Sequence, residues 1–496
     1  MNKKLILKVL GAIMVIEAAL LLVPMVVAFI YGESDWKYFL YTIIGSLAVG
    51  LPVYNLKCEK KNMHALDGYL VVALAWIVLS AIAAVPLCIS GYIPNYLNAI
   101  FETVSGFTTS GVTAMPDVEV LSYSMQFWRI MTHWVGGMGI LVFMLAITPV
   151  AGGGSAMHMM RAESPGPTTE KISPKISTTA KYLYIIYFAF TVAEVIALMI
   201  SGISLYHSIL IAFGTMATGG FSYSNASLAM LTMAQRNIVT VFMFLAGVNF
   251  SLFFLMATGK FKTAIKNEEL RWYAIIYVGL CVVLTLSVYF SNNFETVGEA
   301  IHHVAFMVAS LMTTTGYSSC NFEAWPWFAK HLMLLFMFVG ACAGSTAGGI
   351  KVCRIDIMVK SMKDSIHNLI HPRSVSTVRF NNKEVAADVI RGVRFYMCLF
   401  VVIYAVSMII VCLDPRGDFI TAFSAIDTTI NNNGIAFGGA NGSFYEFTWY
   451  SKVVFIIDML IGRLEIFPII ILLNRMVSPL MNGGRKVVKR LKRHSV

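Results

Sequence analysis

Charged side chains are scarce in this chain of 496 residues: aspartate, glutamate, lysine and arginine together account for 13% of it, whereas 57% of the residues are hydrophobic. A soluble domain carries about 25% charged residues, so the composition excludes an ordinary soluble protein and indicates an integral membrane protein. Apolar runs of about 20 residues, the length with which an α-helix crosses a bilayer, recur along the chain. The first run is longer than the apolar core of a signal peptide, which predicts a helix that is retained.

Paired cysteines are also missing. The eight cysteines are scattered and none stands in a C-x-x-C pair. A disulfide framework or a zinc site would need such clustering, so neither is predicted.

Acidic residues are fewer than basic ones, 26 against 37, and the formal charge is +11. The placement of the basic residues points away from a nucleic-acid partner, because they gather in loops between apolar runs. The positive-inside rule then places these loops and both termini in the cytoplasm, and the basic C-terminal tail is expected to lie against anionic membrane lipids. Most of the lysines and arginines fall in six segments: 3–8, 57–61, 161–181, 260–271, 351–394 and 475–493.

The apolar runs are organised in pairs. The last eight form four pairs, and between the members of each pair lies an outer segment whose apolar stretch is too short to span the membrane. Such a stretch is typical of a re-entrant helix, which is tolerated at membrane depth where it is buried in protein or lines a water-filled cavity. The ten spans that we expect are roughly 5–30, 37–56, 68–90, 125–149, 181–201, 235–258, 272–291, 330–350, 393–413 and 449–477.

Each of the four short stretches ends in a polar turn that contains glycine. The third turn, Thr314-Thr315-Gly316-Tyr317, matches the first four positions of a potassium-channel filter, T-V-G-Y-G, except the second. Four such turns at the same place in successive hairpins form an internal repeat; the alternative is four glycine turns that merely cap short helices. The turns are TTSGVT (108–113), ATGGFS (217–222), TTTGYS (313–318) and NNNGIA (431–436).

The four hairpins run in the same direction, which predicts parallel repeats around an axis along the membrane normal, unlike the inverted repeats of many carriers. Glycine adopts a positive φ without steric cost, so each loop can aim carbonyl groups at that axis, where they replace the hydration shell of a monovalent cation. The helix dipoles would add to this attraction. The predicted ion-binding residues are Thr109, Ser110, Gly111, Thr218, Gly219, Gly220, Thr314, Thr315, Gly316, Asn432, Asn433 and Gly434.

With these repeats the chain resembles the TrkH/KtrB superfamily of potassium-uptake proteins over nearly its entire length. The extra pair of N-terminal spans is similar to the TrkH branch rather than to the shorter KtrB branch. Further segments that carry the resemblance are WVGGMGI (134–140), AESPGP (162–167), GACAGSTAGGIKVCR (340–354) and IGRLEIF (461–467).

The resemblance implies an all-α integral membrane protein with four parallel membrane–pore–membrane repeats around one central pore, located in a prokaryotic cytoplasmic (inner) membrane. It implies selectivity for K⁺ as the transported ion without an organic cofactor, a homodimer, and a cytosolic, nucleotide-binding (TrkA-like) regulatory subunit. In the fourth loop, Asn431 to Asn433 depart from the internal pattern, which leaves its geometry open. The expected divisions are an N-terminal helix pair in 1–60 and repeats in 61–165, 166–268, 269–365 and 366–496.

The segment GACAGSTAGGIK (340–351) interrupts the second span of the third repeat. Its glycine spacing is similar to a phosphate-binding loop, but Ile350 stands where that motif needs lysine. Two alternatives remain from the residues themselves: close helix packing through a G-x-x-x-G pattern, or a weakened helix, since each glycine costs about 1 kcal/mol relative to alanine. The resemblance favours an intramembrane loop that closes the pore, formed by Gly344, Ser345, Thr346, Ala347, Gly348 and Gly349.

Arg463 lies near the middle of the last expected span. An arginine at the bilayer centre costs at least about 2.5–3.5 kcal/mol, so its side chain should face a cavity or a partner. We predict that it faces the pore beside the loop and opposes a passing cation; the alternative is a structural ion pair with Asp458 or Glu465. Glu102 and Asp427 belong to the short helices and are expected to brace the loops.

An enzyme is not predicted, because an intramembrane hydrolase would need a nucleophile, a base and an oxyanion site brought together. A membrane receptor or scaffold would have no use for four filter-like turns.

The loops 150–180 and 363–392 are long and charged enough to carry a regulator. The residues leave open whether transport is passive or coupled to Na⁺ or H⁺, because a symporter could use the same filter. Glu17 and Glu194 are single carboxylates within apolar segments, and each suits either a proton relay or a structural role.

Overall fold

The computed structural model describes residues 3–57, 65–139, 176–374, 377–466 and 468–472. Most of these residues are helical. Strand is confined, within these ranges, to a small antiparallel hairpin of β1 (Arg379–Phe380) and β2 (Lys383–Glu384). The predicted all-α membrane fold is therefore confirmed. The segment 162–167, most of the loop 150–180 and the basic tail lie outside the described ranges.

Six helices in the described part are long and apolar enough to cross a membrane, or seven if one bent pair counts as a span. The first long helix is continuous apart from a turn at Leu21, and it packs against α3 at Gly11, where a side chain would collide with the backbone of Val53 and Tyr54. The helices are α1 (Lys3–Leu20) with α2 (Leu22–Tyr31), α3 (Trp36–Tyr54), α4 (Ala65–Ile89), α9 (Ile176–Ile200), α14 (Glu268–Phe290) and α18 (Ala387–Val411).

The four short outer stretches form helices, as the sequence predicts. Each begins at a side-chain cap, in which an Asn, Ser, Thr or Asp oxygen accepts a hydrogen bond from a backbone N–H of the first turn. The caps are Asn95, Ser204, Thr296 and Asp418. The helices, here called pore helices, are α5 (Tyr96–Phe107), α10 (Leu205–Met216), α15 (Val297–Met312) and α19 (Phe419–Asn431).

The second helices of repeats 2, 3 and 4 differ from the expected continuous spans. Repeat 2 has two helices bent by 93° at 247–249, and repeat 3 has a short helix, a loop and then an exposed helix. Backbone conformation accounts for the breaks: glycines fill the loop of repeat 3, and Glu465 and Ile466, just after the helix that ends at Arg463, have a positive φ. The helices are α6 (Tyr123–Met138), α11 (Met233–Ala246), α12 (Phe250–Ala257), α16 (Trp327–Phe336), α17 (Val352–Ile370) and α20 (Trp449–Arg463).

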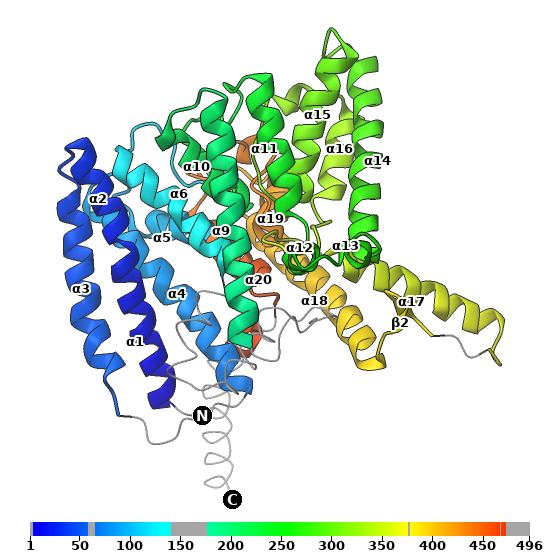
Figure 1. Cartoon of the computed structure of the whole chain (residues 1–496), viewed down its shortest axis with the longest axis horizontal. Coiled ribbons are helices and arrows are strands. Elements are labelled where there is room, and N and C mark those ends of the chain that lie inside the picture. The colour runs from blue at the N-terminus through cyan, green and yellow to red at the C-terminus, as the bar shows by residue number, and fades with distance from the viewer. Residues whose placement is uncertain (1–2, 58–64, 140–175, 375–376, 467, 473–496) are drawn as a thin grey trace, which may run out of the picture.

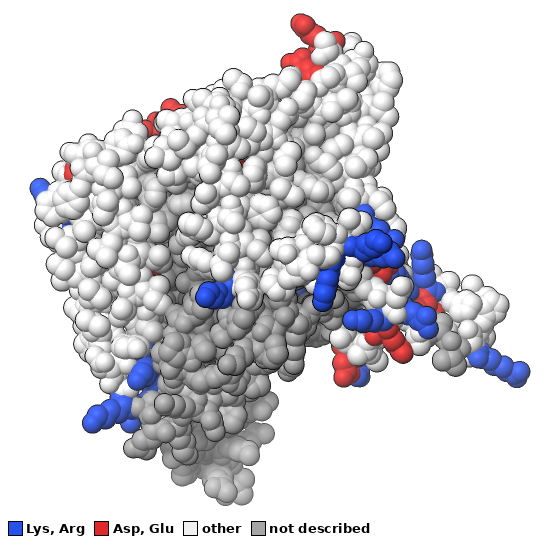
Figure 2. All heavy atoms as spheres, viewed as in Figure 1, with Lys and Arg blue, Asp and Glu red and all other residues white. Residues whose placement is uncertain are grey.

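The N-terminal helices α1 to α3 lie at one side of the molecule, and α14 to α16 lie at the opposite side (Figure 1). The other pore helices, α5, α10 and α19, lie between them (Figure 1). Aromatic side chains at the glycine turns, such as Phe107, Phe221 and Tyr317, are fully buried. Figure 2 shows a broad uncharged band across this face, with most lysines and arginines along its lower edge. We take that edge as the predicted cytoplasmic side. The short elements are α13 (Phe261–Ile265), η1 (Phe322–Ala324) and η2 (Gly438–Ala440).

Candidate functional site

The four glycine turns have the same backbone conformation. Each loop leaves its pore helix through the same hydrogen bond, from the residue before the glycine to a carbonyl five residues earlier: Ser110 to Ser105, Gly219 to Gly214, Thr315 to Ser310 and Asn433 to Thr428, all 2.8–2.9 Å. The residue two before the glycine is left-handed, with φ of 53° to 56°, in Thr109, Thr218, Thr314 and Asn432. The glycines Gly111, Gly220, Gly316 and Gly434 have φ of 78° to 85°.

The fourth loop has the same backbone geometry as the other three, although its sequence departs from theirs. Asn432 stands where the other loops have threonine, yet its φ of 53° equals that of Thr218. Asparagine is enriched several-fold in the left-handed region relative to other side chains. The departure in sequence therefore leaves the path of the backbone unchanged.

The four loops meet in a closed ring. A Cβ on Gly316 would lie 2.6 Å from the carbonyl oxygen of Asn433, and one on Gly434 would lie 3.0 Å from that of Ser110. In the same way Gly111 faces the carbonyl of Gly219, and Gly220 faces that of Thr315, with no room for a side chain. Each glycine thus abuts the residue before the glycine in the next loop, in the order 1, 2, 3, 4 and back to 1.

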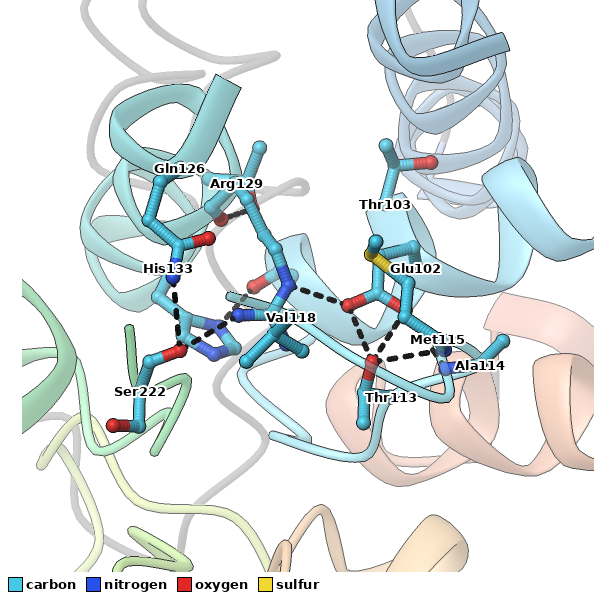
Figure 3. Close-up of polar contacts among 12 residues, drawn as sticks. Glu102, Thr103, Thr113, Ala114, Met115, Val118, Gln126, Arg129, His133 and Ser222 are labelled. Atoms are coloured by element: carbon cyan, nitrogen blue, oxygen red, sulfur yellow. Dashed lines mark hydrogen bonds and ion pairs between the residues drawn. The ribbon is translucent and has the colours of Figure 1, made fainter. Parts of the chain in front are cut away.

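A buried ion pair joins the first two loops (Figure 3). Arg129 Nε lies 2.6 Å from Glu102 Oε1, and the side chains are 2% and 0% exposed. Glu102 accepts hydrogen bonds from Thr113 and from the backbone N–H of Ala114 in loop 1. Arg129 also donates to the carbonyl of Ser222 in loop 2, at 3.0 Å. Glu102 therefore braces loop 1, and its arginine partner carries the brace to loop 2.

The same helix face supports loop 2 at a second point. His133 lies one turn after Arg129, with Nδ1 at 2.7 Å from the carbonyl oxygen of Gly106. Its ring lies 4.0 Å from that of Phe221, and the Arg129 guanidinium lies 3.6 Å from the same ring. A Cβ on Gly219 would collide with the imidazole. Loop 2 thus packs against helix α6.

A polar side chain at one position ties each repeat to the next. It stands four residues after the N-cap of the second helix. Gln126 and Arg236 donate to carbonyls of the following loop, Ser222 and Ser319. Lys330 binds the carbonyl of Glu323, whose carboxylate accepts from Gly438 N–H in loop 4.

Lys452 closes this series of contacts, and its side chain is buried. Its Nζ donates to Asn98 Oδ1 on the first pore helix at 2.9 Å and to the carbonyl of Tyr445 at 2.6 Å. Repeat 4 is thereby joined to repeat 1. A sequence scan could have found this position by aligning the caps Ser122, Thr232, Pro326 and Thr448, but charges at the ends of spans usually face water.

Asparagine amides hold the fourth loop in place. Asn433 Nδ2 donates to the carbonyl of Leu311 in the third pore helix at 2.9 Å, and Asn432 Nδ2 donates to that of Met459 in α20 at 3.1 Å. Asn431 Nδ2 donates to Asp427, so Asp427 braces its own loop from within α19. Longer polar side chains here replace the threonine hydroxyls of the other loops.

The segment 340–350 forms a closed loop directly beneath the ring. Its ends are joined, because Gly340 N–H donates to the carbonyl of Ile350 at 2.6 Å. Its middle touches the third turn and the end of the second pore helix: Gly348 N–H donates to Thr314 Oγ1 at 2.7 Å, and Thr346 Oγ1 donates to the carbonyl of Met216 at 3.0 Å. The segment contains no helix, so helix packing through glycines does not account for it.

Arg463 joins the loop to the first filter turn. Its guanidinium donates to the carbonyl of Thr346 at 2.8 Å and to Thr109 Oγ1 at 3.3 Å. It also donates to the carbonyls of Gly136 and Gly137 at the end of α6. The predicted position in the middle of a continuous span is wrong, since α20 ends at Arg463. Breaking the helix there is what lets this side chain reach under the ring.

The alternative partners of Arg463 are engaged elsewhere. Glu465 forms a buried ion pair with Arg354, which follows the loop, and Asp458 accepts a hydrogen bond from Ser407 at 2.9 Å. The Arg354 guanidinium also lies 4.2 Å from the ring of Tyr396. The predicted filter and loop residues are therefore brought together at one place, with Arg463 between them.

Three comparisons with known proteins agree with each other. The family described as "TrkH: Cation transport protein" matches residues 37–480. The "Trk system potassium uptake protein TrkH" of Escherichia coli (strain K12) is 33% identical over 479 residues, covering 95% of this chain and 98% of the relative. "Trk system potassium uptake protein TrkG" of the same strain is 32% identical, covering 92% and 94%. The crystal structure of the potassium transporter TrkH from Vibrio parahaemolyticus superimposes with a TM-score of 0.85 at 31% identity, covering 95% and 99%.

Proposed function

Since the chain belongs to the TrkH family of cation transport proteins, we propose that it takes up potassium ions across the cytoplasmic membrane through the ring of glycine turns. The resemblance noted in the sequence is thereby confirmed, and with it the expectation that the chain is a transporter and not an enzyme.

The observation that carries the proposal is the ring itself. Four loops with one backbone conformation meet glycine to carbonyl, and the residues before the glycines, Ser110, Gly219, Thr315 and Asn433, occupy equivalent places. Rings of backbone carbonyls replace the hydration shell of K⁺. The C-terminal ends of the pore helices, which lead into these loops, add the negative end of their dipoles. A small monovalent cation is the ligand that such a site suits.

Conduction would be controlled below the ring. The loop 340–350 fills the space beneath the glycine turns, and Arg463 adds a positive charge at the same depth. A cation about 6 Å from a fixed charge at an effective dielectric constant near 20 meets a barrier of about 3 kcal/mol. Opening then requires that the loop and the arginine move away together, since they are hydrogen-bonded to each other.

The partners follow from the same family. The names of the relatives refer to a Trk system, so we propose a homodimer and a cytosolic, TrkA-like nucleotide-binding subunit that docks on the cytoplasmic face, including 363–392. A pull-down from native membranes in gentle detergent should recover this subunit. Recovery of no nucleotide-binding protein would refute that part of the proposal.

Flux in liposomes tests the function. The purified protein, reconstituted without a regulator, should conduct K⁺ in preference to Na⁺. Equal Na⁺ and K⁺ flux would contradict a carbonyl filter. Imposing a Na⁺ or a proton gradient in the same vesicles, with the membrane potential clamped, tests the alternative of a coupled symporter, because a symporter would accumulate K⁺ against its electrochemical gradient and a pore would not.

A further inference from the structure

Both ends of the loop beneath the ring are held by one carboxylate. Glu269, in the first turn of α14, is 4% exposed. Its Oε1 accepts hydrogen bonds from the backbone N–H of Ala343 at 2.7 Å and from that of Cys353 at 3.2 Å. These residues stand near the start of the loop and just beyond its end. A single carboxylate oxygen therefore bridges the two segments at the base of the loop, in addition to the backbone hydrogen bonds between Gly340 and Ile350 and between Val352 and Ala341.

The neighbouring residue, Glu268, faces a different element. Its backbone N–H donates to Asn381 Oδ1 at 2.8 Å, and Asn381 N–H donates in return to Glu268 Oε2 at 2.9 Å. Lys360 of α17 pairs with Glu268 and also donates to the carbonyl of Arg379 at 3.1 Å. The β1–β2 hairpin is thus fixed to the same helical turn that holds the loop.

The hairpin also reaches the base of the loop through apolar side chains. Phe380, on the hairpin, is 3% exposed and packs with Cys353, Ile357 and Val393, with Ala343 at the edge of the cluster. Cys353 and Ala343 are the two residues whose amides bind Glu269. The hairpin therefore reaches the base of the loop by a polar path through α14 and by direct side-chain packing.

The tip of the hairpin faces water. Asn381 and Asn382 have φ of 50° and 60°, the two left-handed positions of a tight type I′ turn. Lys383 and Glu384 are exposed, whereas Phe380 points inward. Figure 1 shows the hairpin beside α17, below the lower end of α14, on the predicted cytoplasmic side.

We propose that this hairpin is the element through which the cytoplasmic face acts on the loop, and that Glu269 is the positioning residue that keeps the loop closed. The inference rests on the proposed role of 340–350 as the gate. Displacing the hairpin pulls on Phe380 and on the Asn381–Glu268 pair, and so loosens the amides that Glu269 holds.

A pair of adjacent glycine substitutions tests the hairpin. Asn381→Gly keeps a residue that accepts positive φ but removes the Oδ1 that binds Glu268. Asn382→Gly makes the same change at the next, exposed position and is the matched control. In liposomes without a regulator, Asn381→Gly should raise K⁺ flux roughly fivefold, as expected when the lost hydrogen bond to Asn381 Oδ1 favours the closed loop. The K⁺/Na⁺ ratio should stay at the parent value, and Asn382→Gly should behave as the parent does.

A second pair tests Glu269. Glu269→Ala removes the acceptor and should raise flux at unchanged selectivity, whereas Glu269→Gln keeps a carbonyl oxygen at the same reach and should bring flux back towards the parent. A purely structural role would instead lower yield, thermal stability and flux together. Equal flux in Glu269→Gln and Glu269→Ala would overturn the role of the oxygen.

The outcomes separate this inference from the proposed function. If the parent conducts K⁺ selectively while Asn381→Gly and Asn382→Gly have the same flux, the hairpin does not act on the loop and the function stands. Reduced flux in Asn381→Gly would also overturn the inference, since the contact would then favour the open loop. A parent that conducts no K⁺ would refute the function itself.

Discussion

The glycine turns and the loop beneath them are both buried, non-helical and rich in small residues, yet they are built in different ways. Each turn is fixed by one hydrogen bond to a carbonyl five residues earlier and by close contact with the next turn. The loop 340–350 is closed at its base and is joined to the third turn by Gly348 and to the end of pore helix α10 by Thr346. Four mutually supporting copies favour a single geometry, whereas a loop held at its base can move as a unit.

The charged residues that support the turns also differ from the one that contacts the loop. Around the turns, Arg129 binds the carbonyl of Ser222 and Lys452 binds the amide oxygen of Asn98, and each of these oxygens belongs to a neighbouring repeat. Beneath them, Arg463 binds the carbonyl of Thr346. The upper charges join parts of a rigid frame, and the lower one joins the frame to the loop. Selectivity and gating should therefore respond to different substitutions.

The largest effect is expected within the ring. Gly316→Val should abolish K⁺ flux, because its Cβ would lie 2.6 Å from the carbonyl oxygen of Asn433 and a branched side chain at φ 85° is strained. Gly111→Ser should leave some flux and relax discrimination against Na⁺. Gly279→Val is the control, since a side chain there meets no neighbour within 4 Å. Parent-like selectivity in both ring variants would remove these turns from the ion path.

Arg463→Ala should raise flux without changing selectivity, by up to about a hundredfold if the barrier near the arginine limits conduction. Arg463→Gln keeps hydrogen-bonding capacity without the charge, so a similar rise in both variants would identify the charge as the cause. Liposome flux without a regulator is the measurement. If Arg463→Ala folds normally and conducts less than the parent, the arginine is a structural partner.

Deleting Gly344 to Gly348 should also raise flux at unchanged selectivity, because the remaining chain is too short to fill the space under the ring. Combined with Arg463→Ala, the deletion should gain less than the product of the two separate effects, since Arg463 is bonded to Thr346 within the deleted segment. Independent, multiplicative gains would show that loop and arginine do not act together.

Lys452→Met tests the frame. It removes both hydrogen bonds of the buried ammonium, to Asn98 and Tyr445, and should lower the K⁺/Na⁺ ratio roughly fivefold, the equivalent of about 1 kcal/mol. Lys452→Gln should recover part of the ratio, because a glutamine, Gln126, already donates a hydrogen bond to the next repeat from the equivalent position of repeat 1. A loss of flux at constant ratio would instead indicate that the lysine supports folding alone.

The smallest effect is expected from Asn432→Thr, which makes the fourth loop like the others. Threonine occupies the same left-handed position in Thr109, Thr218 and Thr314, so flux and selectivity should stay within about twofold of the parent. The lost hydrogen bond to Met459 should cost about 1 kcal/mol of stability, measured by thermal unfolding. Loss of selectivity would show that the asparagine amide itself shapes the ion path.

Much of the fold could be predicted because its signals are local. Apolar length predicts helices, and four polar glycine turns at regular intervals predict a repeat. The broken second helices could not be predicted in the same way. Residues 449–477 read as one apolar run, yet Glu465 and Ile466 have a positive φ and end the helix. A window average of hydrophobicity does not register such a change of backbone conformation.

The supporting residues were missed for a related reason. Arg129, Lys452 and Glu269 are charged residues near the ends of apolar segments, where charge usually faces water. Their buried partners lie far along the chain: Glu269 binds amides 74 and 84 positions away, and Lys452 and Asn98 are 354 positions apart. For Lys452, the sequence signal is its place four residues after the N-cap of the second helix, which it shares with the corresponding residues of the other repeats. This alignment can be made once the caps are known.

The sequence by itself determined the membrane-embedded helical class, the four turns and the likeness to TrkH proteins, because hydrophobic length, glycine and repetition act on neighbouring residues. The tertiary structure decided which carbonyl each glycine abuts, that Arg463 reaches the loop from a broken helix, and that one carboxylate holds both ends of that loop. Those contacts depend on where segments far apart in the chain come to lie, and in a buried site each polar group takes whichever partner the packing brings within reach.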